Sequence, residues 1–250
     1  MAITTLSGII ARRILLNYQV DPRVAARLLP HPFRPKLVHG NAIVGICLFR
    51  FERLRPRGLP AFTGLSSENA AHRIAVEWTD ETGRLRSGIF VLRRDSDSAL
   101  NALLGGWLFP GPHHLSLFSV QDWGNAIRIR VDADDFADPL VELDVEPCAA
   151  LPHHSVFPTL EDASDFFQSG CVGYSLAGDG LSLEGLRMDA ETWKVFPLKI
   201  YGVRSAVFDD PETFPAGAIR FDHGLIMRDI VHKWHVLPAL QGSAETVCPS

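Results

Sequence analysis

Two neighbouring segments near the middle of the chain alternate between apolar and charged residues. The segments 125–131 and 140–146 each place aliphatic side chains on one face and charged side chains on the other, which is typical of half-buried strands. A turn-rich stretch separates them, so we expect an antiparallel hairpin with Ile129 opposite Leu143. This register also sets opposite charges against each other, as Arg130 against Glu142 and Arg128 against Asp144.

The segment 72–94 predicts a second hairpin that turns at residues 80–83. Pairing Glu77 with Arg86 would set Arg73 opposite Phe90. Further strands are predicted at 8–18, 41–54, 193–203 and 205–209, and around 225–232.

Helices are predicted to be few and short. Asp21 followed by Pro22 is a helix start before residues 23–29, and Thr159 with Asp162 resembles a capping box before residues 160–169. Asp95 or Ser96 could cap a third helix that ends at Gly105, and Gly170 would close the second. Strands and helices do not alternate regularly, which argues against a parallel Rossmann-type sheet. We therefore expect a mainly β (α+β) chain.

Composition narrows the function classes. The formal net charge of −5 argues against a nucleic-acid-binding protein. The longest apolar run, residues 42–49, is too short to cross a bilayer, so no membrane partner is expected. No export signal is visible, and the four cysteines form no CxxC pair, which predicts reduced thiols in the cytoplasm. We treat residues 1–250 as one domain, with a core at about 6–238 and a disordered C-terminal tail.

Four segments together resemble a known family: RRILLNYQVDPRVAARLLPHPFRPKLVHGNAIVGICLFRF, SSENAAHR, RRDSDSALNALLGGWLFPGPHH and FPAGAIRFDHGLIMRDIVHKWHVLP. In this order and spacing they are similar to a branch of the acetoacetate decarboxylase-like superfamily that is known mainly as a domain of unknown function. The resemblance implies a mostly antiparallel, cone-shaped β-barrel with a small-molecule pocket inside. Superfamily members often form oligomers, so the resemblance is also compatible with a homo-oligomer.

The resemblance also shows which residue is missing. The decarboxylases carry a glutamate before the central hairpin, matched here by Glu68, and a lysine pair after a Phe-Pro or Tyr-Pro dipeptide. Here Phe109-Pro110 is followed by Gly111, Pro112, His113 and His114. A Schiff base needs a neutral amine, which none of these residues supplies. A migrated lysine remains an alternative, with Lys194 or Lys199 as candidates.

The candidate catalytic residues are Glu68, His113 and His114, and the candidate substrate-binding residues are His72, Arg73 and Arg94. Carboxylate and imidazole groups could do acid–base work, and arginine could hold a substrate carboxylate. Each also has a structural interpretation: Glu68 could cap backbone amides or pair with Arg73, His72 could be a hydrogen-bonded core residue, and one of Arg93 and Arg94 could pair with Asp95 or Asp97.

One member of the pair His113 and His114 should face inward, because adjacent strand residues point to opposite sides. No metal-binding or nucleotide-binding motif is present, so no cofactor is expected. Two functions remain open, beside a cruder third interpretation as a structural subunit with a vestigial pocket. The chain is either an enzyme acting on a small carbonyl or carboxylate compound without a Schiff base, as a lyase, isomerase or hydrolase, or a metabolite-binding barrel without turnover.

Overall fold

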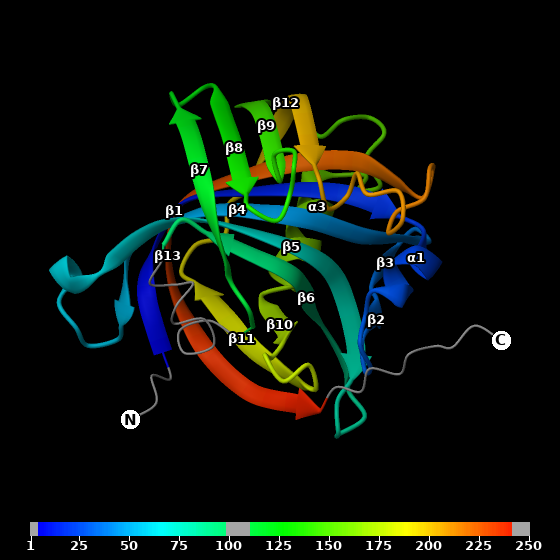
Figure 1. Cartoon of the computed structure of the whole chain (residues 1–250), viewed down its shortest axis with the longest axis horizontal. Helices are drawn as coiled ribbons and strands as arrows, with labels where there is room; N and C mark the ends of the chain where they lie inside the picture. Colours follow the sequence, from blue (N-terminus) through cyan, green and yellow to red (C-terminus); the bar gives the residue numbers. More distant parts are fainter. Residues whose placement is uncertain (1–4, 99–110, 242–250) are drawn as a thin grey trace.

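The fold is built almost entirely from β-strands. The computed structural model describes residues 5–98 and 111–241 (Figure 1). Its strands are β1 (Thr5–Val20), β2 (Arg34–Pro35), β3 (Leu37–Val38), β4 (Asn41–Pro56), β5 (Leu65–Thr79), β6 (Leu85–Ser96), β7 (His114–Asp122), β8 (Ile127–Ala133), β9 (Val141–Pro147), β10 (Val172–Leu176), β11 (Ser182–Ala190), β12 (Phe196–Ser205) and β13 (Ile219–Gln241). The short helices are α1 (Pro22–Arg27), α3 (Leu160–Gln168) and the 3-10 helix η1 (Ala61–Thr63). The expectation of a mainly β chain with few helices is confirmed.

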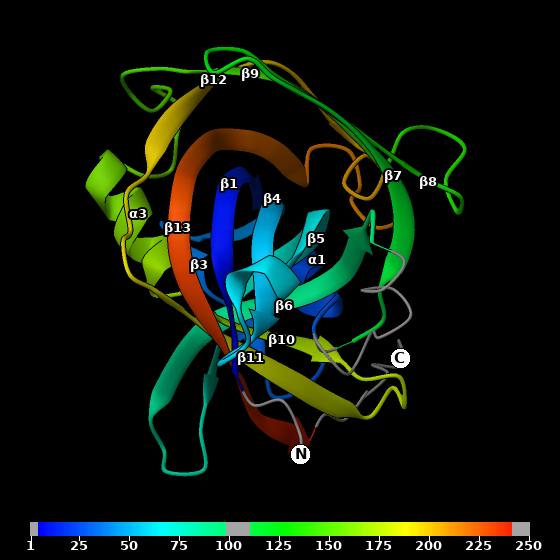
Figure 2. The same cartoon turned by 90° about the vertical axis from the view of Figure 1, so that its left-hand side faces the viewer.

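Five strands form a sheet that belongs to two closed circuits of hydrogen bonding. These are β13, β1, β4, β5 and β6, paired in that order. In the described part of the chain, β10 and β11 connect β6 back to β13 and close a smaller ring. Strands β7, β8, β9 and β12 connect the same two strands by the other side and close a larger ring. Figure 2 shows the larger ring arching over the shared strands, with β10 and β11 on their opposite side.

The shared strands bury side chains on both faces, so the structure has two cores. On β1, Ile14 and Leu16 pack into the core of the larger ring, whereas Leu15 packs into the core of the smaller ring. On β5, Ile74 and Ala75 divide in the same way. Successive residues of a strand point to opposite faces, so neighbouring buried residues of a shared strand alternate between the two cores.

The hairpin of β8 and β9 has the predicted register. Ile129 lies opposite Leu143. The predicted charge pairs also form, with Arg128 Nε 2.9 Å from Asp144 Oδ2 and Arg130 Nη1 2.9 Å from Glu142 Oε1.

The hairpin of β5 and β6 is shifted by one residue from the predicted register, which was wrong. Glu77 lies opposite Ser87 rather than Arg86, and Arg73 lies opposite Val91. The turn runs from Asp80 through Arg84, with Gly83 at a φ of +80° that glycine adopts readily. Arg86 binds the Asp80 carboxylate at 2.6 Å.

Both described helix starts were predicted correctly. The Asp21 side chain accepts the Arg23 N–H at 2.8 Å, and Thr159 Oγ1 accepts the Asp162 N–H at 3.1 Å. The third predicted helix lies largely outside the described residues, and both of its proposed caps, Asp95 and Ser96, end strand β6. The strand predicted at 205–209 was wrong, because a turn follows Ser205. The predicted tail disorder concerns 242–250, outside the described residues.

Strands β10 and β11 were not predicted.

Within residues 5–98 and 111–241, no helix is long and apolar enough to cross a membrane.

Candidate functional site

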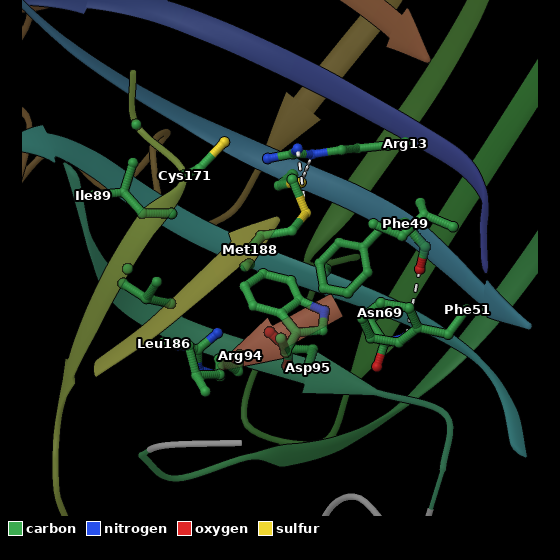
Figure 3. A pocket seen from close by; sticks show the side chains of 18 of the residues that line it. Arg13, Phe49, Phe51, Asn69, Ile89, Arg94, Asp95, Cys171, Leu186 and Met188 are labelled. Carbon is green, nitrogen blue, oxygen red and sulfur yellow. Dashed lines mark hydrogen bonds between the residues drawn. The ribbon is translucent and has the colours of Figure 1, made fainter. Parts of the chain in front are cut away.

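A pocket lies inside the smaller ring, and all seven strands of that ring line it (Figure 3). The centres of water-sized guests can occupy about 70 Å³ of its interior. Its walls are mostly apolar. The polar side chains among them include Arg13, Asn69, Arg94, Asp95 and His113. A mostly apolar cavity with a few polar groups is the usual form of a small-molecule site.

Arg94 of β6 enters this pocket with its orientation fixed by a neighbouring strand. Its Nη2 donates to Ser175 Oγ of β10 at 2.8 Å. Burial lowers the pKa of Arg94 to about 10, so the guanidinium is still charged at neutral pH. The structure therefore holds a positive charge in a largely apolar cavity.

His113 lines the same pocket as a neutral imidazole. Its Nδ1 lies 3.0 Å from the Gly111 carbonyl oxygen, which can only accept, so Nδ1 carries the proton and Nε2 the lone pair. Burial and, secondly, the charge of Arg94 lower the pKa of His113 to about 4. The imidazole is therefore an acceptor at neutral pH.

Gly111 explains part of the glycine- and proline-rich segment before these histidines. Its φ is +79°, and a Cβ there would lie 2.8 Å from Cβ of Ser175. Only glycine fits this close approach without strain, and the approach brings His113 toward the residue that holds Arg94. Residues 105–110, including Phe109-Pro110, lie outside the described part of the structure.

Arg13 of β1 is a pocket residue that the sequence interpretation missed. Figure 3 shows it reaching toward Met188, on the side of the pocket away from Arg94. Its Nε donates to Cys47 Sγ at 3.3 Å, and its guanidinium lies 5.4 Å from the ring centre of Trp193. No carboxylate of the described residues lies within 4 Å of it. The adjacent arginines of β1 were the available signal, because one of such a pair must face each core.

Glu68, the predicted acid or base, is not among the residues that line the pocket. It lies at an alternate position of β5 that faces the larger ring. Its carboxylate accepts from Arg12 Nη2 at 2.7 Å and from Arg50 Nη1 at 3.2 Å. The side chain is 8% exposed, so it is a buried ion-pair partner joining three strands.

The other predicted residues are divided between the two faces. His72 is fully buried in the core of the larger ring, where its Nε2 lies 3.1 Å from Ser205 Oγ. Burial lowers the pKa of His72 to about 3. Arg73 lines a smaller cavity next to the pocket. The His114 side chain is 44% exposed and lies 3.9 Å from Asp135. Of the six candidates, the pocket brings together Arg94 and His113.

Arg93 has the structural role considered for one of the two adjacent arginines. It binds Asp95 through both Nε and Nη2, and its Nη1 binds Asp135. Asp95 also accepts from Ser116 Oγ at 2.9 Å. The Asp95 carboxylate at the pocket wall therefore already accepts hydrogen bonds from Arg93 and Ser116.

All four lysines lie within the described residues, and none of them lines the pocket. Lys199 is exposed and lies 3.7 Å from Glu146, and exposed Lys194 lies over the ring of Phe196. In the same part of the chain, no three His, Cys, Asp or Glu side chains gather in a metal-binding arrangement.

The sequence matches the DUF2071 family, described as uncharacterized conserved protein, over residues 10–214. This chain belongs to the DUF2071 family. No curated relative matches it. In this DUF2071 chain, the matched range contains every residue that lines the pocket except Trp234, which lies after residue 214.

Solved structures of acetoacetate decarboxylase type share this fold. An acetoacetate decarboxylase-like enzyme from Sphingomonas wittichii matches with a TM-score of 0.61 at 13% identity, covering 97% of this chain and 95% of that one. Acetoacetate decarboxylase from Legionella pneumophila matches with a TM-score of 0.59 at 12% identity, over 97% and 88% of the two chains. The enduracididine biosynthesis enzyme MppR, complexed with the condensation product of pyruvate and imidazole 4-carboxaldehyde, matches with a TM-score of 0.58 at 14% identity, over 95% and 88%.

Proposed function

We propose that this chain is a small-molecule enzyme that acts on a compound carrying a carboxylate and a carbonyl group, by acid–base chemistry without a Schiff base. The observation that carries the proposal is the pairing of a charged Arg94 with a neutral His113 in one apolar pocket. We also take the smaller ring to be the cone-shaped barrel, with this pocket as its interior.

The proposed role of Arg94 is to hold the substrate carboxylate. A guanidinium presents a planar set of donors that matches a carboxylate, and hydrogen bonds between two charged groups are the strong ones. Ser175 fixes the orientation of this side chain through Nη2. Arg13, on the far side of the pocket, would stabilise negative charge that develops on the carbonyl oxygen.

The proposed role of His113 is to accept a proton at Nε2. In an isomerase or lyase reaction, this nitrogen removes a proton from the carbon beside the carbonyl, and the electron pair moves to the carbonyl oxygen. In a hydrolase reaction it takes the proton from water. A bound carboxylate would offset the charge of Arg94 and raise the pKa of His113, so the substrate would strengthen its own base.

Two further observations support a keto-acid substrate. The structurally similar MppR has been solved with pyruvate and with a condensation product of pyruvate. Acetoacetate decarboxylase, which has the same fold, is named for a keto acid. None of the four lysines lines the pocket, so an imine would need an amine from elsewhere.

The alternative is a metabolite-binding barrel without turnover. The pKa of about 4 favours it, because an imidazole of such low basicity is a weak base until a ligand changes its surroundings. In that case Arg94 and His113 would orient the ligand and nothing more.

The test is hydrogen–deuterium exchange at the carbon beside the carbonyl, followed by NMR for a panel of 2-oxo and 3-oxo acids in D₂O. The purified protein should accelerate exchange of at least one acid. We expect His113→Gln to slow exchange by about 100-fold. Arg94→Met should weaken binding by about 10- to 100-fold. Arg84→Met, a change at an exposed arginine, is the matched control and should alter neither.

The outcomes separate the hypotheses. Binding of a keto acid without exchange or turnover would identify a binding protein. Exchange at the wild-type rate in His113→Gln would remove the proposed base. A covalent adduct trapped with borohydride and a keto acid would show that an amine takes part after all. Thermal unfolding of each variant separates loss of function from loss of fold.

A further inference from the structure

A second, smaller cavity adjoins the pocket and is enclosed on one side by α3. Arg13, Lys36 and Arg73 line it together with the aromatic rings of Phe166 and Phe167. Arg13 belongs to both cavities. The cavity has room for about one water-sized guest.

Arg73 is buried in this wall with part of its hydrogen-bonding capacity unused. It is 2% exposed, its Nη2 donates to Asn17 Oδ1 at 2.8 Å, and its guanidinium lies 5.1 Å from the ring centre of Phe167. In the described part of the chain, its buried Nη1 has no hydrogen-bond partner. Burial lowers the pKa of Arg73 to about 10, so the group is still a cation at neutral pH.

A chain of buried side chains fixes the position of Arg73. Asn17 Nδ2 lies 3.1 Å from His223 Nε2, and His223 Nδ1 binds Asp222. Because His223 donates through Nδ1 to a carboxylate, its Nε2 accepts from the Asn17 amide, and the amide oxygen is turned toward Arg73. Gly45 is needed beside this chain, since a Cβ there would lie 2.3 Å from the Leu16 carbonyl oxygen and 3.1 Å from Asn17 Oδ1.

The charge around the cavity is one-sided. Three cationic side chains line it, and among the described residues no carboxylate does. Lys36 Nζ donates to Ser169 Oγ at 2.9 Å, and burial lowers its pKa. The carboxylate that acts on Lys36 is that of Glu77, which is bound to Arg34 at 2.8 Å. A buried donor without a partner is destabilising, and more so when it is charged, so a compensating group is expected at Arg73 Nη1.

We propose that this cavity binds a small inorganic anion of about the size of chloride, with Arg73 Nη1 as a donor and with Arg13 and Lys36 supplying positive charge. The cavity is too small for a metabolite, and a preformed cationic wall without carboxylates favours an anion over water. This proposal does not rest on the proposed reaction, although Arg13 lines both cavities. The same chemistry would suit the carboxylate of a ligand that reaches past Arg13 from the larger pocket, so the test distinguishes the two sources.

The first experiment uses crystals of the full chain grown in bromide, with anomalous diffraction to locate the ion. We expect a bromide peak within hydrogen-bond distance of Arg73 Nη1, retained when a keto acid occupies the larger pocket. The second experiment measures thermal unfolding at constant ionic strength while chloride replaces gluconate, an anion too large for the cavity. The melting temperature should rise with chloride and then saturate.

Variants make the second experiment specific. Arg73→Met should abolish the chloride-dependent rise, and Lys36→Met should weaken the apparent affinity for chloride by about tenfold, a loss of about 1.4 kcal/mol. Arg84→Met should respond to chloride as the wild type does. If Arg73→Met does not fold, Lys36→Met and the bromide map still decide the question.

Three results would overturn the proposal. These are a map with no bromide beside Arg73, a chloride response that is equal in the wild type and Arg73→Met, and displacement of the bromide by a keto acid. The last would assign the cavity to the ligand's carboxylate. Bromide that appears only at molar concentration would be an adventitious ion only and would count against the proposal as well.

Discussion

Arg12 and Arg13 are consecutive residues of β1, yet they lie in opposite electrostatic surroundings. Arg12 faces the larger ring and pairs with Glu68 at 2.7 Å and with Asp122 at 3.5 Å. Arg13 faces the smaller ring, where it contacts sulfur atoms and an aromatic ring. Arg93 and Arg94 repeat this division, since Arg93 binds Asp95 and Arg94 enters the pocket.

The comparison shows that one sheet can form a packed core on one face and a pocket on the other, because successive side chains of its strands point to opposite faces. On the face of the larger ring, burying a charge is tolerable because a carboxylate accompanies it. On the face of the smaller ring, the guanidinium of Arg13 contacts sulfur and aromatic groups, and a ligand could supply its balancing charge.

The largest expected effect comes from breaking an ion pair on the face of the larger ring. Glu68→Gln leaves Arg12 and Arg50 without this carboxylate and should destabilise the fold by about 3–5 kcal/mol. Urea unfolding measures the loss, and keto-acid binding measured on the folded fraction should persist. A variant of wild-type stability that has lost activity would instead support the catalytic role predicted for Glu68.

The second prediction compares packing on the two faces. Ile74 is completely buried in the core of the larger ring, whereas Ile89 is half-buried and lines the pocket. Ile74→Ala should cost about 3–4 kcal/mol, because it opens a new cavity in a packed core. Ile89→Ala enlarges an existing cavity and should cost about 1 kcal/mol. Equal losses in chemical denaturation would show that the two cores are packed alike.

The third prediction concerns acid. The pKa of His72 is lowered to about 3 in the folded chain, below its ordinary value of 6.5, so between these values the unfolded chain binds more protons. His72 therefore adds no pH dependence above pH 6.5, and stability falls as the pH drops from 6.5 toward 3, by about 3 kcal/mol or more from this residue.

Removing the titrating group tests this. His72→Gln should be less stable than the wild type at pH 7, because Ser205 loses its imidazole partner, but its stability should decline less steeply with acid. His113→Gln, on the pocket face, should flatten the decline less, because the pKa of His113 is lowered only to about 4. Parallel acid profiles for all three proteins would contradict the assignment.

The smallest expected effect is at the solvent-facing side of the hairpin of β8 and β9. The side chains of Arg128 and Asp144 are 59% and 37% exposed, so their ion pair is largely solvated. Arg128→Gln should change the free energy of unfolding by less than about 1 kcal/mol. A larger loss in a denaturant titration would show that the charge pairs set the register of this hairpin more strongly than the buried Ile129 and Leu143 do.

Sequence patterns correctly predicted features that depend on residues close together in the chain. Alternation gave the register at Ile129, and capping residues marked the starts of α1 and α3. The same alternation required that one of His113 and His114 face inward, and it is His113. The error at Glu77 came from the turn at Asp80, where one additional residue changes every partner along both strands.

The environment of Glu68 could not be read locally. Its partners Arg12 and Arg50 lie on β1 and β4, and only the assembled sheet brings the three together. For the same reason, the adjacent arginines of β1 gave no indication of which one would be matched by a carboxylate. Residue type and motif position predicted the chemistry that is present, but the choice of face depends on contacts between residues far apart in the chain.

The position of β13 at the C-terminal end of the sheet's sequence affects how the chain folds during synthesis. Thr5 pairs with His235, and β13 is a strand of both rings. Neither ring can close until β13, which ends at Gln241, has been synthesised, so one edge of β1 stays unpaired until then. An unpaired strand edge favours pairing with other chains, so this edge of β1 is open to wrong pairing during synthesis.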